Sequence, residues 1–230
     1  MTRGMKRSHR LLPVLLVPWV LLVVVLSAFL GRHWLVEEWY MWRLMNGRDE
    51  ARQAASEVLD RTGSMRLVPR LLLACSEEDG PDPCCDTLVA IVDRAGTSAV
   101  PCLVKGLEDT RTRWNAAYCL GRLGARAKET VPDLVKAMKD GGSEFQVQAL
   151  LCMRAIGPGA EAVPALVELI EKTSEVEVRY QATAAIGDVG KEAAVAVPQL
   201  KRLLADNDPE VRQAAAEALS KIQEATDRGG

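Results

Sequence analysis

The chain has 230 residues, 29 Lys and Arg against 31 Asp and Glu, and a formal net charge of −2. This length fits one domain, or one domain with a membrane segment, and an aromatic content of 4% favours helices over a β-sandwich. The only histidines are His9 and His33, which excludes most His-based catalysis and a His-ligated zinc site in the body of the protein.

The charge is distributed unevenly along the chain. Residues 1–49 carry seven Lys or Arg and three acids, whereas the rest of the chain has six more acids than bases. Proteins bind nucleic acid largely by neutralising phosphates, so an acidic body argues against a nucleic-acid partner.

Residues 11–30 are predicted to form a transmembrane helix. Their sequence, LLPVLLVPWVLLVVVLSAFL, has no charge, and a helix of this length spans about 30 Å, the thickness of a bilayer core. Four bases in the tail at 1–10 give a modest charge bias that favours an N-terminus in the cytoplasm. The alternative is a cleaved signal peptide, but the run is longer than the usual apolar core of about 7–15 residues. We therefore expect an uncleaved signal anchor in a bacterial cytoplasmic membrane, with the remaining chain on the periplasmic or extracellular side.

Residues 31–48 follow this run and are rich in aromatic side chains. Tryptophan and tyrosine settle at the headgroup level, where a ring is half apolar and half wet. We expect a short interfacial helix with these residues at the membrane surface; the alternative is a docking surface for another membrane helix. The residues concerned are Trp34, Trp39, Tyr40 and Trp42.

The tetrapeptide V-P-x-L then recurs five times at nearly constant spacing. It begins at Val68, Val100, Val131, Val163 and Val197, so the steps are 32, 31, 32 and 34 residues. Repeats of this period are typical of solenoids and arrays.

A second pattern lies between these tetrapeptides, with an offset of 33 residues. Its positions lie three or four residues apart and so share one side of a helix, and each set ends at a glycine, where a helix can stop in a left-handed residue. The sets are Ala116, Ala149, Ala182 and Ala215; Leu120, Met153, Ile186 and Leu219; Leu123, Ile156, Val189 and Ile222; and Gly124, Gly157 and Gly190.

Each repeat is therefore predicted to be two helices, an A helix that begins near V-P-x-L and a B helix that ends at the glycine. Asp208 and Pro209 provide a cap and a first-turn proline for the last B helix. Residues 49–63 match the last B helix closely and are predicted to begin the stack as a half-repeat. About five A/B pairs follow, so we predict an all-α solenoid over 49–223 and a flexible tail at 224–230.

These patterns resemble the HEAT-like repeat, in the short bacterial form also found in phycobilin lyases. The resemblance covers residues 49–223 and is strongest at Asp208–Ile222 and Val178–Gly190, whereas Thr112 and Gln146 depart from it. It implies a right-handed α-solenoid used for protein contacts, and by itself it implies no activity.

The chain contains no phosphate loop, Rossmann fingerprint, G-x-S-x-G or H-E-x-x-H motif. A bilin-lyase activity would need chromophore-handling residues, and none is identified. We therefore expect a non-catalytic protein with no cofactor, no bound metal and no small-molecule substrate.

Six cysteines fall into two groups. Cys102, Cys119 and Cys152 are predicted to be reduced and buried in the helical core. The other three, Cys75, Cys84 and Cys85, flank the loop SEEDGPDP. In an exported protein Cys75 is expected to pair with Cys84 or Cys85, and a three-thiolate metal site is the alternative.

The B helices are expected to line the concave surface of the solenoid. Their outward positions are Trp114, Ala117, Tyr118 and Gly121 in the second repeat, Val147, Leu150, Leu151 and Arg154 in the third, and Tyr180, Thr183, Ala184 and Gly187 in the fourth. The predicted partner site comprises Trp114, Tyr118, Val147, Leu151 and Tyr180, rimmed by Arg113, Arg154 and Arg179. The alternative is that tight packing between repeats buries these apolar residues.

The sequence therefore predicts a membrane-anchored scaffold that binds a protein or peptide. The alternative is a structural accessory subunit of a larger membrane complex, held through the transmembrane and aromatic segments.

Overall fold

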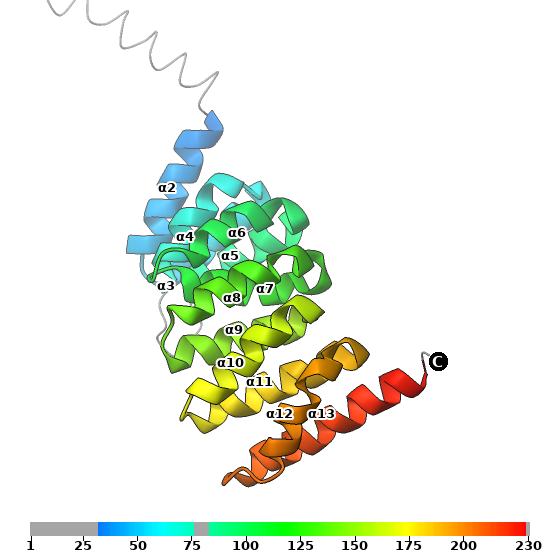
Figure 1. The fold of residues 1–230 in the computed structure, drawn as a ribbon. Helices are drawn as coiled ribbons and strands as arrows, with labels where there is room; N and C mark the ends of the chain where they lie inside the picture. The colour runs from blue at the N-terminus through cyan, green and yellow to red at the C-terminus, as the bar shows by residue number, and fades with distance from the viewer. Residues whose placement is uncertain (1–31, 76–82, 229–230) are drawn as a thin grey trace, which may run out of the picture. The chain divides into compact units, whose positions relative to one another are not determined.

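The computed structural model describes residues 32–75 and 83–228 (Figure 1). The chain divides into two compact units, Met1–Leu59 and Asp60–Gly230. The predicted membrane-spanning run at 11–30 lies outside the described residues.

The first unit contains α2, Arg32–Asn46, and most of α3, Asp49–Thr62. One side of α2 is buried at Met41 and Leu44, and the backbone carbonyl of Leu44 accepts a hydrogen bond of 3.0 Å from Nε of Arg52 in α3. The predicted aromatic segment is therefore helical, and a helix covers the half-repeat predicted at 49–63.

The second unit consists of paired helices, and no strand occurs in the described parts of the chain. This confirms the predicted all-α repeat fold. The A helices are α4 Val68–Ala74, α6 Val100–Leu107, α8 Val131–Lys139, α10 Val163–Lys172 and α12 Val197–Leu203. The B helices are α5 Pro83–Ala95, α7 Arg113–Leu123, α9 Ser143–Ile156, α11 Val176–Val189 and α13 Pro209–Asp227.

Every A helix begins at the valine of V-P-x-L, so its proline lies in the first turn, where the missing N–H is not needed. A short 3₁₀ segment precedes each one, although the repeat pattern predicts only two helices per unit. These segments are η1 Met65–Leu67, η2 Gly96–Ala99, η3 Gly124–Thr130, η4 Ala160–Ala162 and η5 Gly190–Ala196.

The glycines that follow the B helices have positive φ angles. Gly124, Gly157 and Gly190 have φ angles of 58°, 92° and 74°. Side chains other than glycine rarely adopt these angles, so the glycine ends the helix and lets the chain turn toward the next A helix.

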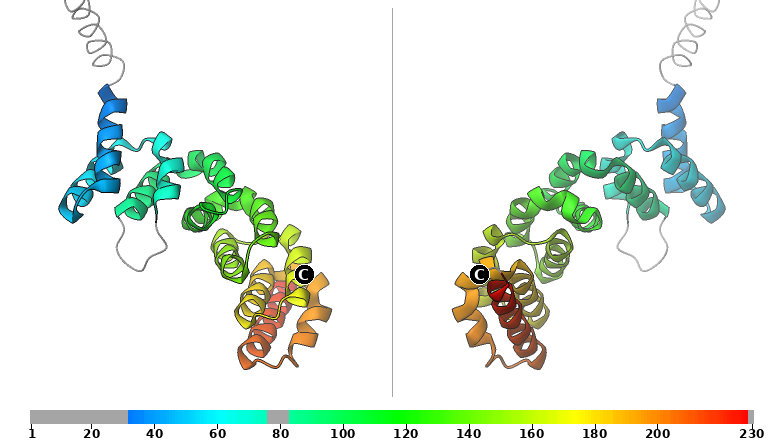
Figure 2. Two further views of the ribbon diagram at one scale, coloured as in Figure 1. Left: turned by 90° about the vertical axis from the view of Figure 1, so that its left-hand side faces the viewer. Right: turned by 90° about the vertical axis from the view of Figure 1, so that its right-hand side faces the viewer.

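The B helices α7, α9, α11 and α13 pack side by side in this order. Within the second unit the pairs follow a curve, with these B helices on its inner side (Figure 2). The alanines predicted to face the core, Ala116, Ala149, Ala182 and Ala215, are fully buried. Their small side chains let the paired helices approach closely, as predicted.

One continuous helical run among the described residues, Pro83–Leu107, is long and apolar enough to cross a membrane by length and composition. It is not one straight helix, because Gly96 at φ +59° separates α5 from α6. Its residues Ile91, Val92 and Leu103 are buried. These buried residues belong to the core of the first repeats.

The last helix is longer than predicted. It continues to Asp227, so residues 224–227 of the predicted tail are helical. Pairs four residues apart support the extra turn, since Gln223 donates to Asp227 and Arg228 to Glu224. The repeat pattern predicts an end at residue 223, although the next glycines are Gly229 and Gly230.

A close approach between B helices lies at Gly187 of α11. A β-carbon placed there would lie 2.9 Å from the backbone Cα of Ala218 in α13. We expect Gly187→Ala to lower the free energy of unfolding by about 1–2 kcal/mol, because this overlap exceeds the gain in helix propensity. Urea denaturation measures the loss. The control is Gly142→Ala, where nothing lies within 4 Å; equal effects in the two variants would contradict the close contact.

Candidate functional site

The apolar residues predicted to bind a partner lie on three adjacent B helices. Trp114 and Tyr118 lie on α7, Val147 and Leu151 on α9, and Tyr180 on α11; together they are called the aromatic strip. Tyr118 is 46% exposed and Leu151 is 44% exposed, while the other three are half-buried. The strip therefore presents apolar surface to solvent at its centre.

The neighbouring outward positions behave differently. Ala117, Leu150, Thr183 and Gly187 are buried. Gly121 lies against α9, since a β-carbon on it would come 3.2 Å from the Cα of Cys152. The two predictions for the outward face, an exposed partner site and burial between repeats, thus apply to different residues. One column of residues packs between B helices, and the aromatic strip beside it remains partly exposed.

Two surface pockets lie on either side of Thr110 and Arg113, and the smaller one is lined by Trp114. The smaller, of about 280 Å³, is formed by α7 and the start of α9, and includes Trp114, Glu144 and Phe145. The larger, of about 450 Å³, extends between α6 and α8. Both are lined by Thr110 and Arg113. The end of the aromatic strip is therefore hollowed and could receive a side chain of a partner.

Arg113, the first arginine of the predicted rim, reaches toward the following repeat. Its guanidinium lies 5.2 Å from the ring centroid of Phe145, a cation–π geometry. Its Nη1 also donates to the backbone carbonyl of Asp140 at 3.4 Å. Arg113 therefore forms both a wall of the two pockets and a contact between repeats.

Arg154, the second rim arginine, is part of an ion network across α9, α11 and α13. Its Nε donates to the Asp188 carboxylate at 2.8 Å, and Lys221 donates to the same carboxylate at 2.7 Å. Burial alone would raise the pKa of Asp188, but these two hydrogen bonds outweigh it and lower the pKa. The carboxylate thus stays charged and links three B helices.

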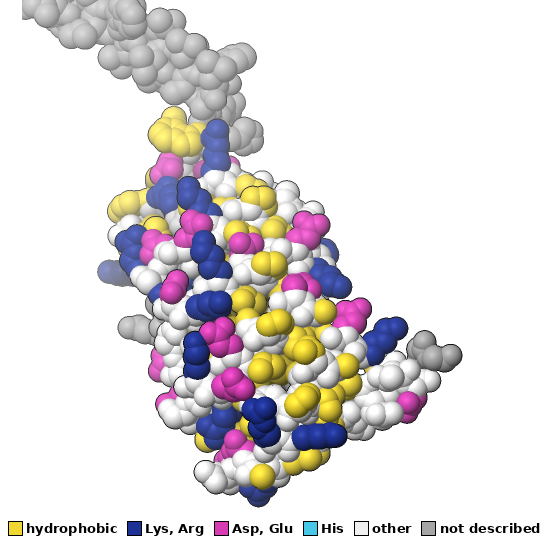
Figure 3. Space-filling view, in the orientation of Figure 1, with side chains coloured by type: hydrophobic (Ala, Val, Ile, Leu, Met, Phe, Trp, Pro, Cys, Tyr) yellow, Lys and Arg dark blue, Asp and Glu magenta, His cyan; other side chains and the backbone are white. Residues whose placement is uncertain are grey.

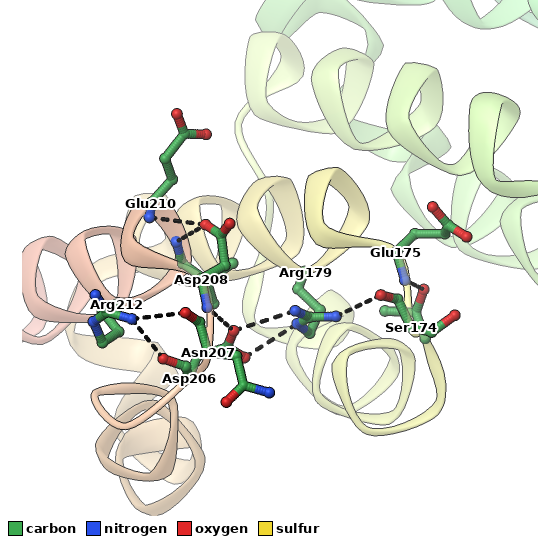
Figure 4. A network of polar contacts seen from close by, with 10 residues as sticks. Ser174, Glu175, Arg179, Asp206, Asn207, Asp208, Glu210 and Arg212 are labelled. Atoms are coloured by element: carbon green, nitrogen blue, oxygen red, sulfur yellow. Dashed lines mark hydrogen bonds and ion pairs between the residues drawn. The ribbon is translucent and has the colours of Figure 1, made fainter.

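Arg179, the third rim arginine, is the most enclosed. Its Nε and Nη2 donate to the two carboxylate oxygens of Asp206 at 3.1 and 3.2 Å, and its Nη1 donates to the carbonyl of Ser174 at 2.8 Å (Figure 4). The side chains of Arg179 and Asp206 are only 15% and 12% exposed. Arg212 closes the network by donating to the carbonyls of Asp206 and Asn207.

All three arginines thus bond to the next repeat. Arg113 and Arg179 reach acceptors 27 residues further on, and Arg154 reaches Gln181, 27 residues on, as well as Asp188, 34 residues on. The helical periodicity predicts these arginines at the rim but does not indicate their acceptors. A search of the sequence for polar residues 27 apart could have found these acceptors. This spacing is shorter than the repeat by about one and a half helical turns. The aromatic strip therefore lies between two rows of polar contacts that hold the repeats together.

The strip ends at the last repeat, where the outward positions are polar or small. Gln213, Ala216, Glu217 and Ser220 are all exposed on α13. Gln213 donates to Glu217 along the helix. The contrast with Tyr118 and Leu151 shows that this solenoid does place polar residues on an outward face.

The opposite face of the second unit, formed by the A helices, is more mixed. Figure 3 shows basic and acidic side chains alternating along one side of this face and hydrophobic side chains along the other. The A-helix face carries an exposed proline at the start of each helix, such as Pro101, Pro132 and Pro164. These recur with the repeat, so they reflect the fold.

The cysteines predicted to be structural lie in two environments. Cys119 and Cys152 are buried thiols, and burial raises the pKa of each to about 12, so both stay protonated. Cys102 is only half-buried, which corrects the expectation that it lies in the core.

The other three cysteines lie beside residues 76–82, which are outside the described residues. Cys75 and Cys84 are buried, Cys85 is half-buried, and their pairing stays a prediction. Over the described ranges, no three His, Cys, Asp or Glu side chains are grouped as metal ligands.

The aromatic residues predicted at the membrane surface lie on α2. Trp34, Trp39 and Trp42 are at least half exposed. Tyr40 is half-buried, and its ring meets that of Trp39 edge-to-face with 4.7 Å between centroids. Three of the four predicted residues therefore share the outer side of the helix.

Curved stacks of short helix pairs, joined by contacts between successive repeats, define a class of α-solenoid repeat proteins. Residues 100–187 and 163–228 match the family of HEAT repeats, which together covers more than half of the chain. The chain belongs to the HEAT-repeat family, as the V-P-x-L and B-helix patterns indicated. No curated protein matches it.

Proposed function

We propose that this protein is a non-catalytic scaffold that binds a protein or peptide partner through the aromatic strip. The observation that carries the proposal is the exposure of Tyr118 and Leu151 in the centre of a B-helix face. HEAT repeats typically serve protein–protein interaction, and the strip gives that general role a location on this chain.

The composition of the strip fits a binding surface. Tryptophan and tyrosine dominate the binding energy of protein interfaces, especially where a ring enters a pocket. Trp114 lines the smaller pocket, and Tyr118 lies one helical turn further along α7. The polar last repeat shows that exposed apolar residues are not required by the fold. A partner side chain entering the smaller pocket would contact Trp114 and Phe145 together.

We further propose that residues 11–30 anchor the scaffold in a bacterial cytoplasmic membrane, with the solenoid outside the cytoplasm. The uncharged run and the four preceding bases support this topology. The likeness to the short repeats of phycobilin lyases is taken as a likeness of repeat type, without lyase activity.

A phosphatase that is active only after export tests the topology. Fused after Gly230, it should be active, and a reporter that works only in the cytosol should be inactive at the same position. The reverse pattern would overturn the orientation. Sequencing the mature N-terminus distinguishes the anchor from a cleaved signal, since a chain beginning at Ala28 would have lost residues 11–27.

Photo-crosslinking in the full chain tests the strip. A photoreactive residue at Tyr118 or Leu151 should capture one discrete protein, whereas the same residue at Gln213 or Glu217 should not. Tyr118→Ala should weaken recovery of that protein about tenfold or more, as expected for a hot-spot residue, with little change in Tm.

Equal capture from the polar positions on α13 would contradict a partner site at the strip. The alternative function, an accessory subunit held by the membrane segment, predicts another outcome. In that case the partner would crosslink near residues 11–48 and would still bind when Tyr118 and Leu151 are alanine.

A further inference from the structure

The helix α2 is apolar on two sides. Met41 and Leu44 are buried on its inner side. On its outer side Trp34, Trp39 and Trp42 are 52%, 50% and 61% exposed. A helix that is apolar on both sides needs an apolar environment on both. The protein supplies one of these at Met41 and Leu44, and the side chains on the outer side are exposed.

The outer side is a continuous surface along the whole helix. Leu35 and Met45 are 47% and 50% exposed and lie beside the three tryptophans. At 1.5 Å per residue, the surface from Trp34 to Met45 is about 16 Å long. Five large apolar side chains over this length form a patch of the kind that marks an interaction site.

The chain itself indicates what covers this surface. The uncharged run at 11–30 ends two residues before α2 begins at Arg32. A helix so close to the end of a membrane-spanning run starts at the headgroup layer. Three tryptophans fit that layer, because the indole ring is apolar while its N–H needs a polar partner.

Charged residues at the border of the face support the same environment. The guanidinium of Arg43 lies 4.9 Å from the ring centroid of Trp39. In this position an arginine can reach lipid phosphates while the ring beneath it stays among the upper acyl chains. Residues 32–48 hold three arginines against two glutamates, which also suits an anionic membrane surface.

We infer that the outer face of α2, formed by Trp34, Leu35, Trp39, Trp42 and Met45, lies in the headgroup region of the bilayer with the helix along the membrane surface. The inference rests on the proposed membrane anchor. A helix crossing the bilayer would place Glu38 and Arg43 in the acyl region. A helix lying on the surface keeps Arg43 at the border of this face and leaves Glu38, which lies among its apolar residues, within reach of the headgroups.

Tryptophan fluorescence of the full chain in vesicles tests this. The vesicles contain phosphatidylcholine and phosphatidylglycerol, with or without bromine near the headgroup end of the acyl chains. One variant keeps only Trp42, with Trp19, Trp34, Trp39 and Trp114 changed to phenylalanine. The matched control keeps only Trp114, on α7 in the second unit. Bromolipid should quench Trp42 at least about twofold more strongly than Trp114, as expected for an interfacial ring.

The other outcomes overturn the inference. Trp42 quenched by aqueous acrylamide but not by bromolipid would lie in solvent. Trp42 shielded from both quenchers would lie against protein, such as a second copy of the chain. If the Trp42 variant does not fold by circular dichroism, a variant that keeps only Trp34 replaces it.

Vesicle flotation at alkaline pH separates this inference from the proposed anchor. Chains that float without bromolipid quenching keep the anchor and refute only the position of α2. Chains that do not float refute the anchor, and the inference with it.

Discussion

Replacing Leu120 by alanine is expected to lower the free energy of unfolding by about 2–5 kcal/mol. Leu120 is fully buried on α7, on the side that faces its paired A helix. The substitution removes apolar contacts and leaves a cavity that close-packed helices fill only partly. Urea denaturation monitored by circular dichroism measures the loss.

The matched control is Leu151→Ala on the neighbouring B helix. Leu151 is the same residue type but 44% exposed, in the centre of the aromatic strip. Its truncation should change stability by no more than about 0.5 kcal/mol, which is usual for surface positions. Equal losses at Leu120 and Leu151 would mean that the strip is covered in the isolated protein, and the proposed binding surface would lose its support.

Replacing Asp206 by alanine is expected to lower the free energy of unfolding by about 2–4 kcal/mol. The Asp206 carboxylate accepts both hydrogen bonds from Arg179 and one from the backbone N–H of Asp208. Both side chains of the ion pair are largely buried. Without the carboxylate, a guanidinium between the last two repeats loses its partner, which costs more than the pair itself contributes.

Asp109→Ala is the control for this substitution. Asp109 also lies between an A helix and a B helix, and it pairs with Arg111 at 2.8 Å. That pair is exposed, so water and salt screen it, and its loss should leave stability essentially unchanged. An effect at Asp109 as large as that at Asp206 would show that position in the repeat matters more than burial of the pair.

The same ion pair should make stability depend on pH. Burial would raise the pKa of Asp206, but the N–H of Asp208 and the Arg179 guanidinium lower it below the ordinary value of 3.8. A lowered pKa in the folded protein stabilises it above that ordinary value, and this stabilisation disappears as the pH falls through the folded pKa. Asp206→Asn should therefore destabilise the protein at pH 7 and differ less from the wild type at pH 3.

On the B-helix face, different residues stabilise the fold and form the proposed binding surface. The rows that contain Arg154 and Arg179 hold successive repeats in register, so their charges are already paired. The aromatic strip between them contributes less to the core and remains partly exposed. Variants in the rows are expected to alter stability, whereas variants in the strip are expected to alter partner binding.

Much of the repeat architecture could be predicted from the sequence because its signals are local. The valine and proline that begin an A helix, the left-handed glycine that ends a B helix, and the cap at Asp208 each act within one or two turns. Asp208 does accept hydrogen bonds from the N–H groups of Glu210 and Val211. Helical periodicity likewise identified the alanines of the core, because one side of each helix must be buried against its partner.

Only the tertiary structure decided which outward residues are exposed. Tyr118 and Ala117 are adjacent on α7, and both lie far from the alanine stripe, yet one is exposed and the other buried. Their difference depends on the distance and angle of the next B helix, which the close approaches at Gly121 and Gly187 determine. The acceptors of Arg154 and Arg179 lie a repeat away for the same reason. Periodicity describes each helix about its own axis, and burial between helices depends on how two axes pack.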